Sequence, residues 1–224
     1  MRERTIKWLL AKEVAWISIS AYGDFWFTGF LRKRVANLTS YILNPFLVGF
    51  ILILLLSLKA TATPLDAAKW VLISVVICIL PVLLAIVYLV RKQKLGDLFI
   101  NIREQRTKIY LLAGVFVSIG CIILPYLGAP PLLKATFVAG LSAVAIFMGI
   151  NLLWKISLHA AFMTASVTVL VILYGPVAAA GAVLVLLTAW SRVELKQHSL
   201  AQVVAGILVA ILIILAVFYL FGLV

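Results

Sequence analysis

Long apolar segments dominate the sequence and restrict the folds that the chain can adopt. Of its 224 residues, 66% are hydrophobic and only 12% are charged, and several apolar runs approach 20 residues. A run of that length crosses the ~30 Å hydrocarbon core of a bilayer as an α-helix. We therefore predict an all-α, polytopic transmembrane helical bundle of about six to seven spans, and not a soluble domain.

The apolar segments divide the chain into a short basic start and one bundle. Residues 1–40 mix Lys and Arg with aromatic side chains, which is typical of an interfacial segment. Residues 41–224 are expected to form the bundle, with no second domain. The predicted spans lie at about 41–58, 67–90, 109–127, 135–153, 160–174, 177–189 and 200–224.

Seven spans would place three polar loops on one face of the membrane, at residues 91–108, 154–159 and 190–199. Of the 19 Lys and Arg residues, only Lys59, Lys69 and Lys134 would fall on the other face. The positive-inside rule then predicts that the polar face is cytoplasmic. The net charge of +12 fits this orientation and contact with anionic lipids, and no recognisable motif indicates nucleic-acid binding.

One polar stretch, residues 190–202, separates the last two apolar segments. If it continues as a helix, Glu194, His198 and Gln202 lie at i, i+4 and i+8 on a single stripe. A histidine and an amide at the end of a membrane-spanning helix cost free energy unless they have hydrogen-bond partners or a function. We therefore treat this stretch as the centre of a candidate site.

The three polar loops carry side chains suited to phosphate chemistry. Arginine binds phosphate in a bidentate manner, and histidine can act as a nucleophile or a general acid near neutral pH. The candidates include the only two histidines of the chain, so we predict a phosphate site at the membrane surface. They are Arg103 and Arg106 in the first loop, Lys155, Ser157 and His159 in the second, and Arg192 and His198 in the third.

The spacing of these residues resembles the type 2 phosphatidic acid phosphatase superfamily of integral-membrane lipid phosphatases. Its third motif, S-R-x₅-H-x₃-D, is matched by Ser191-Arg192, His198 and Gln202, with Gln in the Asp place. Its second motif, P-S-G-H, keeps Ser157 and His159 here. Its first motif, K-x₆-R-P, keeps only Arg106, within a run at 103–106 similar to a bacterial variant. The resemblance covers roughly residues 90–210.

The resemblance implies a mechanism for an amphiphilic substrate, either a lipid phosphate or an isoprenyl phosphate or diphosphate. His198 would attack phosphorus to give a phosphohistidine, and His159 would protonate the leaving oxygen and later activate water. The phosphate oxygens would be held by Arg192, Arg106, Arg103, Lys155 and Ser157. The family needs no metal and no other cofactor. The resemblance also implies a multi-pass protein of a bacterial or archaeal cell membrane, surrounded by membrane lipids.

Gln202 is the main departure from the family pattern. An Asp at that place fixes the nucleophile's tautomer and stabilises its imidazolium form, whereas a neutral amide does only the first. Glu194 can supply the missing charge if the helix begins early enough. The alternative hypothesis is a weak or inactive phosphatase-like protein that binds or transports anionic lipid. A metal-dependent lipid transferase is disfavoured because the sequence contains no D-x₂-D or D-x₃-D motif.

Overall fold

The computed structural model describes residues 29–92 and 103–224, with side chains described from Arg106 onward in the second part. Every regular element within those residues is a helix, which confirms the all-α prediction. After a first helix, Gly29–Ile42, the elements are α2 (Pro45–Ala60), α3 (Pro64–Ser74), η1 (Val75–Ile79), α4 (Leu80–Arg91), α5 (Arg103–Tyr126), α6 (Pro131–Leu153), α7 (Leu158–Tyr174), η2 (Gly175–Gly181), α8 (Ala182–Glu194) and α9 (Leu200–Leu220).

Five helical stretches in the described residues are long and apolar enough to cross a membrane. They are Pro64–Arg91, Arg106–Tyr126, Pro131–Leu153, Leu158–Glu194 and Leu200–Leu220. A sixth span results if Gly29–Ile42 and α2, which meet at a 44° bend, are counted as one. Large apolar side chains such as Leu111, Val115 and Ile122 on α5 are exposed, as expected of surfaces that face lipid. The protein is therefore an integral membrane protein.

The stretch Leu158–Glu194 is a hairpin and not a straight rod. Its 37 residues would extend about 55 Å as one helix, nearly twice the thickness of a bilayer core. The chain turns at Gly175, whose φ of 73° is a left-handed conformation that glycine adopts without strain. A Cβ on Gly181 would lie 3.1 Å from the Val167 side chain, so the start of α8 packs closely on α7. The two arms correspond to the predicted spans 160–174 and 177–189.

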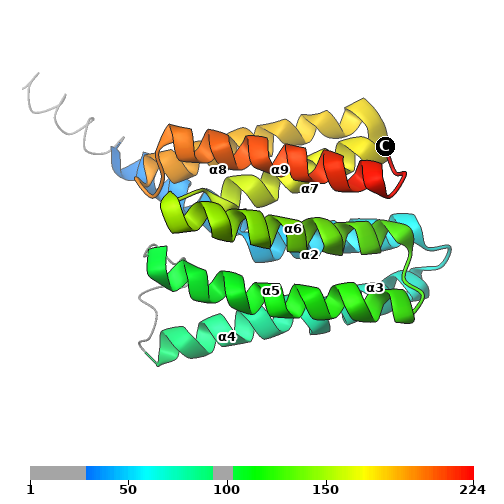
Figure 1. The fold of residues 1–224 in the computed structure, drawn as a ribbon. Coiled ribbons are helices and arrows are strands. Elements are labelled where there is room, and N and C mark those ends of the chain that lie inside the picture. Colours follow the sequence, from blue (N-terminus) through cyan, green and yellow to red (C-terminus); the bar gives the residue numbers. More distant parts are fainter. Residues whose placement is uncertain (1–28, 93–102) are drawn as a thin grey trace, which may run out of the picture.

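The helices form one bundle whose functional candidates lie at a single end (Figure 1). The first turns of α5, α7 and α9 and the last turn of α8 meet there, at the left of the view. Helix α5 packs against α6, α7 packs against α9, and α2 packs against α7, so helices from both halves of the chain meet in the bundle. Fully buried Leu124, Leu133 and Phe218 belong to the main apolar core towards the other end.

The first predicted span begins with a bend that the sequence signals. The Asn44 side chain caps α2 by accepting hydrogen bonds from the backbone N–H groups of Phe46 and Leu47, and Pro45 occupies the first helical position. Residues before this cap form a separate helix, Gly29–Ile42. The predicted interfacial segment at residues 1–40 lies mostly outside the described residues.

The predicted continuous helix through residues 194–202 is wrong. Helix α8 ends at Glu194, and Lys196 takes a left-handed conformation with φ 54°. A second cap, Ser199, then starts α9 by accepting a hydrogen bond from the Gln202 N–H. Glu194 and His198 therefore belong to different structural elements and do not share a helical face.

Candidate active site

The loop between α8 and α9 folds around the backbone carbonyl of Arg192. The N–H of Lys196 bonds the Val193 carbonyl, and the N–H of Gln197 bonds the Arg192 carbonyl, which together form a Schellman helix end. The His198 N–H also bonds the Arg192 carbonyl, at 3.2 Å. The loop thereby brings His198 back beside Arg192 although a helical turn no longer connects them.

Gln202 determines which nitrogen of His198 carries the proton. The Oε1 atom of Gln202 lies 3.2 Å from the backbone nitrogen of Ser199, which can only donate, so this atom is the amide oxygen. The same oxygen lies 3.2 Å from Nδ1 of His198, and it can only accept. Nδ1 must therefore carry the proton, which leaves the lone pair of Nε2 available for chemistry.

His159 reaches the same place because α7 starts against the first turns of α9. The backbone N–H of Ser157 donates to the Gln202 carbonyl at 3.3 Å, and the Ser157 hydroxyl caps α7 by accepting from the Ala160 N–H. A Cβ on Gly206 would lie only 2.8 Å from the Ser157 carbonyl oxygen, so glycine permits this approach. His159 lies close enough to His198 for their charges to interact.

Two basic residues tie the loop before α7 to the neighbouring elements. The Arg106 guanidinium donates from Nη1 to the Ile156 carbonyl at 3.1 Å, which links α5 to this loop. The Lys155 ammonium donates to the Gln197 carbonyl at 2.7 Å, which links it to the α8–α9 loop. These two bonds join the first turn of α5, the loop before α7 and the α8–α9 loop into one cluster.

Arg192 and Arg106 are buried cations that lack acidic partners in the part of the chain that the structure describes. They are 3% and 7% exposed, and the ion pair found there joins Arg32 to Glu194 instead. Arg192 donates from Nη1 to the Ser40 hydroxyl at 2.7 Å, whereas its Nε–H has no hydrogen-bond partner among those residues. Buried charges without counter-ions are costly, so this pair of guanidinium groups favours an anionic ligand.

The same charges act on the neighbouring titratable groups. Burial, followed by the positive charges of Arg106, Arg192 and Lys155, lowers the pKa of His198 to about 3, against the opposing effect of its hydrogen bond to Gln202. Burial and the two guanidinium groups also lower the pKa of Lys155. His198 is therefore neutral at physiological pH, which is the state that a nucleophile requires.

A comparison with models of protein families identifies the family of the chain. A sequence model of the PAP2 superfamily matches residues 111–223, half of the chain. The chain belongs to the PAP2 superfamily. It is therefore a membrane protein of a phosphatase family, and the resemblance to type 2 phosphatidic acid phosphatases is confirmed. Neither the curated proteins nor the solved structures gave a match.

The PAP2 match covers the second and third motifs and begins just after the first. His159, Arg192 and His198 lie within the matched residues, whereas Arg106 lies before them. The geometry nevertheless brings Arg106 to the same cluster, through its bond to Ile156. The structure therefore places Arg106 in the cluster, although the family match does not include this residue.

Most of the predicted site residues come together in one cluster. The cluster contains Arg106, Lys155, Ser157, His159, Arg192, His198 and Gln202. The Glu194 carboxylate is 2.6 Å from the Arg32 guanidinium on the exposed side of α8, and the structure shows no contact between it and His198. The Arg103 side chain lies outside the described residues.

Ser40 is a contact of the cluster that the sequence analysis missed. Its hydroxyl accepts the Arg192 hydrogen bond from a helix 152 residues earlier in the chain. Ser40 is buried, although it precedes the family match and belongs to no motif. A lone serine in the helix Gly29–Ile42 carries no spacing signal, so only the tertiary structure identifies it.

Proposed function

We propose that this protein is a membrane-embedded phosphatase that hydrolyses a lipid or isoprenoid phosphate, or diphosphate, through a phosphohistidine at the membrane surface. The observation that carries the proposal is the pair of buried guanidinium groups, Arg106 and Arg192, beside two imidazoles. Membership of the PAP2 superfamily supports the same chemistry. Phosphate oxygens are the natural ligands of such a guanidinium pair.

In the first step, Nε2 of His198 attacks phosphorus with its lone pair. A P–N bond forms as the bond between phosphorus and the leaving oxygen breaks, and His159 transfers a proton to that oxygen. Gln202 holds the imidazole through Nδ1 and keeps Nε2 directed towards the substrate. Arg106 and Arg192 stabilise the negative charge on the phosphoryl oxygens.

In the second step, water hydrolyses the phosphohistidine. His159, now neutral, accepts a proton as the water oxygen attacks phosphorus, and the P–N bond breaks to release inorganic phosphate and neutral His198. The bound phosphate carries up to two negative charges, which offset the two guanidinium groups. Substrate binding therefore makes it easier for His159 to hold the proton that it transfers to the leaving oxygen.

The direct test is phosphate release by the purified protein in detergent micelles. The substrates are a prenyl diphosphate, a prenyl monophosphate and phosphatidic acid, and the matched variants are His198→Gln and His159→Gln. We expect release by the wild type and a loss of at least about 100-fold in each variant. Full activity of His198→Gln would refute the assigned nucleophile.

Gln202 supports the alternative function, which is binding of an anionic lipid without turnover. A neutral amide stabilises an imidazolium less than a carboxylate does, so the reaction through His198 has less electrostatic support. Saturable binding of phosphatidic acid with no phosphate release from any substrate would favour this alternative.

The site is inferred to lie on the cytoplasmic face, from the distribution of basic residues along the sequence. Lys196 is a suitable reporter because it lies in the α8–α9 loop at this end of the bundle. In a variant that lacks Cys78 and Cys121, a Lys196→Cys change should be labelled in sealed cells only after the membrane is made permeable. Labelling by an impermeant reagent from outside would reverse the orientation.

A further inference from the structure

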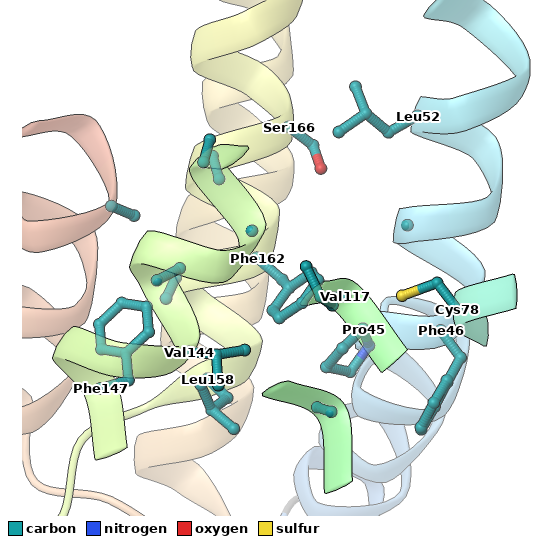
Figure 2. A pocket seen from close by; sticks show the side chains of 18 of the residues that line it. Pro45, Phe46, Leu52, Cys78, Val117, Val144, Phe147, Leu158, Phe162 and Ser166 are labelled. Carbon is teal, nitrogen blue, oxygen red and sulfur yellow. The ribbon is translucent and has the colours of Figure 1, made fainter. Parts of the chain in front are cut away.

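A cavity of about 320 Å³ leads from the polar cluster into the interior of the bundle. Arg106, His159 and Arg192 line its polar end. The remaining walls are almost entirely apolar and come from α2, the segment Cys78–Ile86, α5, α6, α7 and α9. Figure 2 shows Pro45, Leu52, Cys78, Val117 and Phe162 around this space. The cavity thus combines a cationic end with a hydrocarbon-like interior.

The cavity extends about half-way across a membrane. On α5 its lining runs from Arg106 to Val117, and on α7 from Leu158 to Val169. At a rise of 1.5 Å per residue, these segments correspond to a depth of roughly 15 Å, compared with a bilayer core of ~30 Å. This depth fits a chain that lies parallel to the helices with its polar group at the surface.

Small residues and a distorted helix keep the space open. Gly49 on α2 lines the cavity, and a Cβ placed there would meet no atom within 4 Å. Beside α2, Cys78 and Ile79 line the cavity from η1, a π-helical turn just before Pro81. Proline has no N–H to continue an α-helical ladder, and the wider turn accommodates that loss.

We propose that this cavity holds the single hydrocarbon chain of a lipid phosphate, inside the bundle, while the phosphate lies between Arg106 and Arg192. This inference rests on the proposed function. An apolar cavity of about 150 Å³ holds one benzene, so a cavity of about 320 Å³ takes roughly a dozen carbons, which is one chain and not two. The substrate class is therefore a single-chain prenyl or alkyl phosphate, in preference to a two-chain phosphatidate.

The selectivity arises from volume and not from hydrophobic transfer. A chain that moves from the bilayer into this cavity exchanges one apolar environment for another and gains little transfer free energy. A larger side chain on the wall instead removes space that the substrate needs, with a cost comparable to overpacking of a core. Gly49 is therefore a specificity-determining position, distant from the atoms that react.

The test compares Gly49→Phe with the control Gly149→Phe. Gly149 also has open space around its Cβ position, but it is exposed and does not line the cavity. Rates are measured with farnesyl phosphate, decyl phosphate, dioleoyl phosphatidate and water-soluble phenyl phosphate. We expect Gly49→Phe to lower kcat/KM for the two single-chain lipids about tenfold and to leave phenyl phosphate unchanged. Gly149→Phe should change none of them.

The proposal is overturned if Gly49→Phe affects all substrates equally or none, or if the wild type prefers phosphatidate to decyl phosphate. If no substrate releases phosphate, the proposed function fails, and a binding measurement still tests the chain site. A decyl phosphonate with a photoreactive group at the chain end should cross-link to cavity residues such as Val117 and Cys78. Cross-links confined to the exposed residues Leu208 and Leu212 on α9 would place the chain in the bilayer and refute the inference.

Discussion

The close approach of α7 to α9 at Gly206 predicts the effect of a single added methyl group. In Gly206→Ala, the new Cβ would lie 2.8 Å from the Ser157 carbonyl oxygen, whereas ordinary contacts begin at 3.4 Å. The obstacle is a backbone atom that cannot rotate away, so the start of α7 must move by about 0.6 Å. His159 follows Ser157 by two residues and moves with it.

A displacement of that size has a calculable cost. Misplacement of a reacting group by about 1 Å costs about 100-fold in rate, so about 0.6 Å corresponds to roughly tenfold in kcat. Overpacking of the contact should also lower the free energy of unfolding by about 1–3 kcal/mol. The assay is phosphate release at saturating substrate, together with thermal unfolding of the same preparation.

Gly149→Ala is the matched control because a Cβ at that position meets no atom within 4 Å. It removes a helical glycine in the same way and should leave both activity and stability close to wild type. Wild-type kcat in Gly206→Ala would contradict the role of this contact in positioning His159. Because Gly→Ala favours a helix, helix propensity cannot cause a loss, and equal losses in the two variants would contradict a specific role for the Gly206 contact.

Three further predictions concern the neighbours of the two catalytic candidates. Gln202→Leu removes the acceptor for Nδ1 of His198 and should lower kcat by at least about 100-fold. The isosteric Gln202→Glu supplies a carboxylate and should raise kcat. The opposite order of the two variants in initial rates would refute the assignment of the Nδ1 tautomer. Ser40→Ala removes the hydroxyl that accepts a hydrogen bond from Arg192 and leaves that buried donor unpaired. The factor by which KM rises should exceed the factor by which kcat falls by about tenfold, and Ser40→Thr should restore both constants. Equal loss in Ser40→Ala and Ser40→Thr would contradict the positioning role. Because the pKa of His198 is about 3 in the folded protein and 6.5 in an unfolded chain, the unfolded chain binds the proton first, and stability should fall as the pH drops below 6.5. The imidazole NMR signals of His198 should therefore not titrate between about pH 5 and 8, and a midpoint near 6.5 would contradict its burial beside three cations.

The sequence was sufficient to predict the main layout because hydrophobic length alone determines a membrane bundle. The apolar runs predict the membrane-spanning helices, and the spacing of Ser191, Arg192 and His198 predicts a common site. These features depend on local patterns or on a short motif, which a single sequence contains.

Other features depend on backbone geometry and on contacts between distant segments. The helical stripe from Glu194 to Gln202 was predicted from periodicity, but Lys196 takes a left-handed conformation that no side-chain pattern signals. The Ser40 contact joins segments 152 residues apart. The apolar cavity results from which small residues face one another across several helices, and that pairing is set only by the packed structure.

The covalent intermediate provides the most direct measurement of the central claim. The protein is mixed briefly with a ³²P-labelled prenyl phosphate, quenched in alkali to preserve a phosphoramidate bond, digested and analysed by mass spectrometry. We expect one phosphorylated histidine, His198, and no label retained in His198→Gln. Rapid phosphate release without any labelled histidine, or label on His159 instead, would contradict it.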